Sequence, residues 1–189
     1  MSRAYRITVR ESLQKDLSAS DEVCSNLEIL EILPQEQMAD LLRGELQGRG
    51  FEDVGGKLVR TENGVTVTVD PKSGDVGVKA EAADSIELKA ERDDWGYDDA
   101  GPGEEMIRRR AQEHLKLDLE RRASQQQAQL QSEATEKLEG AMEDVRKELG
   151  QAINRVTAEA LKKKAASIGQ IKQMTEDPAS GSLTITVEV

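Results

Sequence analysis

One stretch, residues 104–173, constrains the fold most, because no proline interrupts it and good helix formers fill it. Apolar or small residues recur along it at positions 107, 111, 115, 119, 123, 130, 134, 138, 142, 145, 149, 153, 156 and 160. The steps are mostly of four and drift from a strict heptad toward an eleven-residue repeat, which is typical of a nearly straight helix packed on another helix. Gln126 also falls on this stripe and weakens it. Since an exposed helix is not stabilised by propensity alone, we expect a helical arm over 104–175 that finds a partner.

The segment after this arm, 182–189, has the pattern of a β-strand. Leu183, Ile185 and Val187 alternate with threonines and a glutamate, as in a half-buried strand. A straight arm would carry the strand roughly 100 Å away from the other predicted strands. Gly140, near the middle of the arm, favours a fold-back into an antiparallel helical hairpin, although one interior glycine costs only about 1 kcal/mol. We therefore expect the strand to return to the sheet of its own chain, with exchange between subunits on a straight arm as the alternative.

Residues 1–91 predict a β-rich head. Apolar side chains fall on odd positions from Tyr5 to Leu17 and resume after the polar "SASDE", which predicts a hairpin of 4–18 with 22–31. Leu13 and Leu17 would also suit one helical turn. Pro34 then stands at a predicted helix start. The apolar face of this short helix consists of Met38, Leu41, Leu42 and Leu46, and Gly48 and Gly50 end it.

The rest of the head predicts a meander of short strands. Asn63-Gly64 lies between two β-rich runs and tolerates the positive φ angles of a type I′ turn. Asp70, Pro71 and Gly74 predict a second turn, and "SIELKAE" predicts a separate further strand. With aromatic residues at only 2% of the chain, the core must consist of Val, Ile, Leu and Ala. The predicted class is α+β, with an antiparallel sheet.

An acidic segment, "ERDDWGYDDAGPGEE", separates the head from the arm. We interpret residues 92–103 as a hinge, because the glycines and the proline specify neither strand nor helix. Aromatic residues flanked by acids also resemble a short partner-docking segment, and its candidate residues are Asp93, Asp94, Trp95, Tyr97, Asp98 and Asp99. So many carboxylates could also collect a divalent cation, although their spacing does not match an EF-hand. Acidic residues near 104 equally suit a helix amino terminus.

Charge and composition exclude several classes of partner. Residues 1–100 carry 12 Lys and Arg against 22 Asp and Glu, and this acidity works against binding nucleic acid. The basic runs at 108–110 and 162–164 are interpreted as solvated helical charge. No apolar run approaches the roughly 20 residues that cross a bilayer, and "MSRAYRITVRES" does not have the pattern of a signal peptide. We expect a cytoplasmic protein with no membrane insertion.

No constellation of residues predicts catalysis. The chain lacks a glycine-rich loop followed by Lys-Ser or Lys-Thr, so we expect it neither to bind nor to hydrolyse ATP. His114 is the single histidine and is predicted to lie on a helix surface. Cys24 is the single cysteine, so an intrachain disulfide is impossible, and in a predicted strand it should be a small buried hydrophobe. We expect no enzyme activity, no cofactor and no metal.

Several segments resemble one bacterial family. "LEILEILPQEQMADLL", "GVTVTVDPKSGDV", "INRVTAEALKKKAASIGQIK" and "MTEDPASGSLTITVEV" are similar to FtsH ternary system proteins, over essentially the whole chain. The resemblance implies an accessory component encoded beside an FtsH-like or MoxR-like AAA+ ATPase, in systems proposed to act in biological conflict. It implies no active-site residues.

Three classes of function remain. The first is a non-enzymatic adaptor or scaffold that binds protein partners, among them an AAA+ ATPase, and associates with itself through helices over 104–173. The second is a regulator or substrate-delivery factor of an AAA+ protease, which shares the same structural interpretation. The third, a metal-dependent enzyme using the acidic segment, lacks convergent His, Cys and carboxylate groups.

Overall fold

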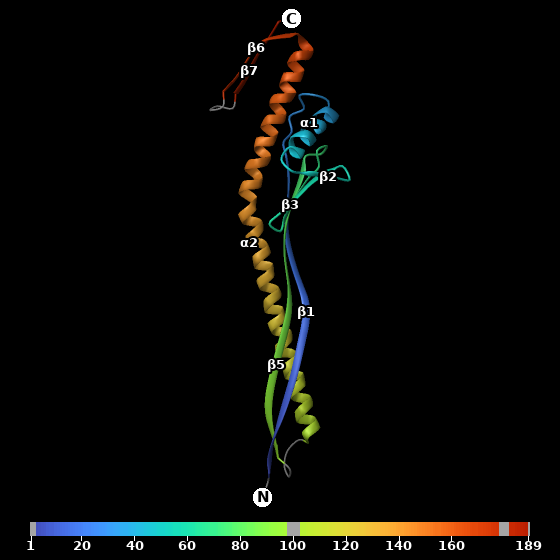
Figure 1. Ribbon diagram of the computed structural model, residues 1–189, viewed down its shortest axis with the longest axis vertical. Helices are drawn as coiled ribbons and strands as arrows, with labels where there is room; N and C mark the ends of the chain where they lie inside the picture. Colours follow the sequence, from blue (N-terminus) through green and yellow to red (C-terminus); the bar gives the residue numbers. More distant parts are fainter. Residues whose placement is uncertain (1–2, 98–102, 178–181, 189) are drawn as a thin grey trace. The chain divides into compact units, whose positions relative to one another are not determined.

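The computed structural model describes residues 3–97, 103–177 and 182–188 and has an α+β fold, as predicted (Figure 1). A five-stranded antiparallel sheet has the order β1-β5-β4-β3-β2, and a separate two-stranded sheet pairs β6 with β7. The elements are β1 Ala4–Asn26, α1 Gln35–Gln47, β2 Glu52–Val54, β3 Lys57–Glu62, β4 Val65–Val69, β5 Asp75–Tyr97, α2 Glu104–Ile168, β6 Gln170–Asp177 and β7 Ser182–Glu188.

The chain divides into two compact units, each with segments far apart in the sequence. The first unit consists of Met1–Asp21 and Glu81–Glu136, and the second consists of Glu22–Ala80 and Lys137–Val189. The strands β1 and β5 and the helix α2 therefore each contribute residues to both units. This division differs from the predicted series of a head, a hinge and an arm along the chain.

The predicted hairpin of 4–18 with 22–31 is wrong. The first predicted strand and residues 22–26 of the second lie in one continuous strand, β1, and its partner is β5. The polar "SASDE" segment stays extended because the alternation continues through it, with Leu17 and Ala19 buried in the first unit. The turn preference of these polar residues is therefore weaker than the stabilisation from pairing with the distant strand β5.

The strand β5 is also longer than predicted. It has 23 residues, so "SIELKAE" is part of it and does not form a strand of its own. It extends through Tyr97, which places residues 92–97 of the predicted hinge in a strand, and 98–102 lie outside the described residues. Glu104 and Glu105 occupy the first turn of α2, as expected. Residues 91–97 of the acidic segment thus form the end of a strand, and residues 104 and 105 begin a helix.

The first unit has two small apolar clusters between the β1–β5 ribbon and α2. Leu17, Ala82 and Leu130 are buried in one, and Ile7 and Leu115 are buried in the other. In this unit the two strands run alongside the helix (Figure 1). The apolar stripe of α2 therefore packs on strands of its own chain, and the prediction of a helical packing partner is wrong for this unit.

Polar side chains of α2 also hold the outer edge of β1. Gln127 Nε2 donates to the Ser18 carbonyl at 2.7 Å, and Gln131 Nε2 donates to the Ser20 carbonyl at 3.2 Å. Thr135 Oγ1 donates to the Asp21 carboxylate at 2.8 Å. The glutamine-rich part of the helix, which weakens the apolar stripe, thus satisfies carbonyl groups at a sheet edge.

The short helix α1 and the β3–β4 hairpin of the second unit follow the sequence closely. Pro34 caps α1, and Met38, Leu42 and Leu46 are buried on the predicted face. Asn63 and Gly64 have φ angles of 52° and 78°, which confirms a turn with two positive φ angles. Local chemistry determines both features.

The core of the second unit joins α1, β3, β4, β5 and the later part of α2. Its members from α2 include Leu138, Leu149 and Val156, packed with strand residues such as Leu58 and Val78. This cluster again places the stripe of α2 against its own chain, here against the short helix α1 as well as against strands.

The predicted helical hairpin is wrong, because α2 is one helix of 65 residues from Glu104 to Ile168. Gly140 lies inside it and makes no turn; the side on which a Cβ would stand is open. One interior glycine costs only about 1 kcal/mol, which the packing of the stripe outweighs. The helix also ends earlier than predicted, since residues 170–177 form β6.

The strand β7 does not return to the five-stranded sheet, so that prediction is also wrong. It pairs antiparallel with β6, with Met174 opposite Ile185 and Ile171 opposite Val187. Gly169 precedes the hairpin, and a Cβ there would collide with the Glu188 backbone. Because β6 is adjacent to β7 in the sequence, this pairing forms without any fold-back of the helix.

Candidate docking surface on β5 and an ion network in the second unit

The end of β5 is held to β1 by side chains on the solvent-facing side of the ribbon. Arg6 forms an ion pair with Asp93, and Thr8 Oγ1 donates to Asp93 at 2.6 Å. Arg10 Nε donates to Glu91 at 2.9 Å. Asp93 and Glu91 therefore each have a cationic partner within the same unit. Two acidic residues of the predicted docking or metal-binding segment are therefore already engaged in ion pairs within their own chain.

Hydrogen bonds set the protonation state of Asp93. The Arg6 guanidinium, followed by the Thr8 hydroxyl, holds the pKa of Asp93 below its ordinary value. The carboxylate therefore stays ionised and paired at neutral pH. The paired carboxylate thus fixes the end of β5 to β1.

Two aromatic side chains follow the Arg6–Asp93 pair along β5 and are exposed. Trp95 is 62% exposed and Tyr97 is 54% exposed, and alternation places both on the same side of β5 as Asp93. Gly96 between them is buried, and a Cβ there would lie 2.5 Å from the Tyr5 ring. Tyr5 therefore occupies the opposite side of the strand, and the two aromatic rings are left facing solvent.

The remaining candidate docking residues fall elsewhere. Asp94 lies on the other side of β5 and pairs with Arg92 at 3.1 Å. Asp98 and Asp99 lie outside the described residues. The structure thus brings together Asp93, Trp95 and Tyr97 of the predicted set.

Residues weighed for other chemistry do not converge in the described ranges. No group of three His, Cys, Asp or Glu side chains there is arranged to hold a metal ion. His114 is exposed on α2, as predicted. Cys24 is exposed as well, so its predicted burial is wrong; it lies near the end of β1, where the alternation of buried positions has ended. No helix within the described part of the chain has the length and apolar content to cross a membrane.

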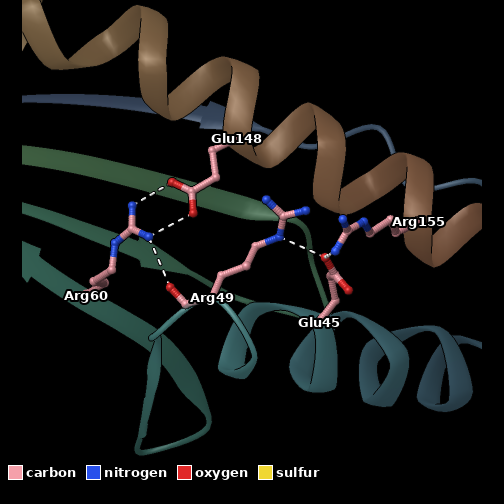
Figure 2. Close-up of polar contacts among 5 residues, drawn as sticks. All are labelled: Glu45, Arg49, Arg60, Glu148 and Arg155. Carbon is pink, nitrogen blue, oxygen red and sulfur yellow. Dashed lines mark hydrogen bonds and ion pairs between the residues drawn. The ribbon is translucent and has the colours of Figure 1, made fainter. Parts of the chain in front are cut away.

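The second unit contains an ion network that the sequence did not predict. Arg60 of β3 donates to both carboxylate oxygens of Glu148 of α2, at 2.8 and 2.6 Å (Figure 2). It also donates to the Arg49 carbonyl at 3.2 Å and lies 4.6 Å from the centre of the Phe51 ring. Both charged side chains are about three-quarters buried, with exposures of 22% and 25%.

A second carboxylate extends the network. Glu45 of α1 accepts a hydrogen bond from Arg49 Nε at 2.7 Å and pairs with Arg155 of α2 at 3.4 Å (Figure 2). Hydrogen bonds from Arg60 hold the pKa of Glu148 below its ordinary value, and those same bonds raise the pKa of Arg60. Each charged group in this network has a partner, so the network ties β3, α1 and α2 together. No local pattern signals a pair 88 residues apart.

Comparison with known proteins identifies the family of the chain. No curated protein and no solved structure was found to match it. A family model described as FtsH ternary system domain X5 matches residues 1–189. The resemblance noted in the sequence is thus confirmed over the whole chain. The protein belongs to the FtsH ternary system domain X5 family.

Proposed function

We propose that this chain is a non-enzymatic adaptor or scaffold of an FtsH ternary system, and that it binds a protein partner through Trp95 and Tyr97. Family membership supports association with that system. The observation that carries the docking proposal is the exposure of both rings on a strand end fixed by the Arg6–Asp93 pair.

Physical chemistry favours this strand end as a protein-binding surface. Trp and Tyr are enriched among the residues that dominate binding energy, since each buries a large area at a small entropic cost. The neighbouring carboxylate is held in place before binding, which lowers the ordering cost of association. We propose that the partner is the AAA+ ATPase of the same system.

The test is a binding measurement between the full chain and the purified AAA+ ATPase that family membership implies as its partner. The double variant Trp95→Ala/Tyr97→Ala should weaken binding by at least about tenfold, since interface aromatics often contribute 2 kcal/mol or more. Leu117→Ala is the matched control, because Leu117 is 53% exposed on α2 of the same unit. Equal losses in both variants, or wild-type affinity in the double variant, would contradict the docking site.

The same experiment separates an adaptor from a regulator. An adaptor should leave the ATP turnover of the partner unchanged on binding, whereas a regulator should change it. The non-enzymatic proposal itself is tested by titrating ATP into the purified chain, where we expect no calorimetric signal. Micromolar ATP binding would overturn it.

A further inference from the structure

The β6–β7 hairpin has two edges of different character. In β6 the register shifts between Ile171 and Gln173, so Lys172 has no residue directly opposite it in β7, and its Nζ pairs with the Glu188 carboxylate at 2.7 Å. A bulge is one of the devices that protect a sheet edge from further pairing. The β6 edge is therefore protected.

The β7 edge has none of these devices. Its register from Ser182 to Thr186 is continuous, and its sequence alternates β-branched and apolar residues with a single charge, Glu188. Among the described residues, the hairpin pairs with no further strand. An isolated two-stranded sheet is marginally stable in water, and additional strands stabilise it. The free edge is thus an open site for strand addition.

One face of the hairpin is apolar and incompletely covered. Met174 lies opposite Ile185 and Ile171 lies opposite Val187, so these four residues share a face. Met174 is 48% exposed, and the other three are half-buried. The opposite face carries Thr184 and Thr186, both exposed. Any added strand must therefore repeat this two-sided pattern in register.

The β7 sequence itself satisfies that requirement. If two copies pair antiparallel around Ile185, Ile185 faces its own copy and Thr184 faces Thr186 of the second copy. Leu183 then lies opposite Val187, and Ser182 lies opposite Glu188. Apolar residues meet apolar residues, polar meet polar, and no like charges are opposed. The strand is self-complementary over its full length.

We infer that β7 is a homodimerisation edge, at which two copies of this chain pair antiparallel around Ile185 to form a four-stranded sheet β6-β7-β7-β6. This interface differs from the helix-mediated association expected from the sequence, because the stripe of α2 is already packed on strands and on α1 of its own chain. It is also independent of the docking of a partner at Trp95.

Two variants of the full chain test the register, and they differ only at position 184. Thr184→Lys/Thr186→Lys places lysine opposite lysine twice across the two-fold axis. Thr184→Glu/Thr186→Lys places glutamate opposite lysine twice. Within the hairpin these positions face Thr175 and Gln173, which are uncharged, so both variants keep the hairpin pairing.

Sedimentation equilibrium over micromolar concentrations is the measurement. We expect the wild type and the Glu/Lys variant to dimerise, and the Lys/Lys variant to have a dissociation constant at least about tenfold higher. A monomeric wild type would overturn the inference. So would a Lys/Lys variant that dimerises as the wild type does, or a Glu/Lys variant as weak as Lys/Lys.

Discussion

The Arg60 guanidinium grips both carboxylate oxygens of Glu148, and so joins strand β3 to helix α2 across 88 residues of sequence. Two parallel hydrogen bonds between ionised groups are stronger and more directional than a single neutral one. Because three-quarters of each side chain is buried, solvent screens this pair less than a surface pair. The pair is thus a partly buried, bidentate contact between β3 and α2 of the second unit.

Replacing Arg60 should therefore destabilise the protein. We expect Arg60→Ala to lower the free energy of unfolding by roughly 1–3 kcal/mol, because the partly buried Glu148 loses its partner. Arg108→Ala is the control, since Arg108 and Glu104 form a pair in which both side chains are 56% exposed. That variant should change stability by less than about 0.5 kcal/mol. Urea denaturation measures both, and equal effects would contradict the structural role of the Arg60 pair.

Acidification should remove the contribution of Glu148. Its folded pKa lies below the ordinary value of 4.5, so its ionised form stabilises the fold at higher pH. This stabilisation is complete above the unfolded pKa and is lost as the pH falls through the folded pKa. We expect the stability difference between wild type and Glu148→Gln to be constant from pH 7 to about 5.5 and to shrink below that. Urea denaturation at each pH measures it; a difference that grows on acidification would contradict the assigned direction.

Gly140 tests the continuity of α2. Because a Cβ at Gly140 meets nothing within 4 Å, Gly140→Ala should stabilise the protein by about 0.5–1 kcal/mol through helix propensity. Gly74→Ala should do the opposite, since Gly74 has φ +79° and a Cβ there lies 2.7 Å from the Leu27 carbonyl oxygen. Thermal unfolding distinguishes the two signs. A destabilising Gly140→Ala would favour a turn at that position.

Removal of the β6–β7 hairpin should leave the two cores folded. The apolar clusters of both units draw their described residues from other elements, so deleting 170–189 removes none of them. We expect a nearly unchanged melting temperature. Leu42→Ala is the positive control, because Leu42 is fully buried and its truncation should cost roughly 2–5 kcal/mol. If the deletion unfolded the protein as strongly as Leu42→Ala, the hairpin would be part of the core.

Features that depend on neighbouring residues could be predicted from the sequence. The Asn63-Gly64 turn, the buried face of α1 and the stripe of α2 all follow from φ preference or helical period, which act over a few positions. The α+β class follows from these local patterns. The acidic aromatic segment was visible as a candidate site, but its place at a strand end was not.

The pairing of distant segments, in contrast, became visible only in the folded chain. Local periodicity cannot show that "SASDE" stays extended beside β5, that Arg60 reaches Glu148, or that the stripe of α2 packs on strands. Each depends on contacts between residues many tens of positions apart. The same is true of Gly140, whose cost of about 1 kcal/mol is small beside the burial of the stripe around it. Packing therefore favours one continuous helix where the sequence left a turn at Gly140 open, and β7 pairs with its neighbour β6.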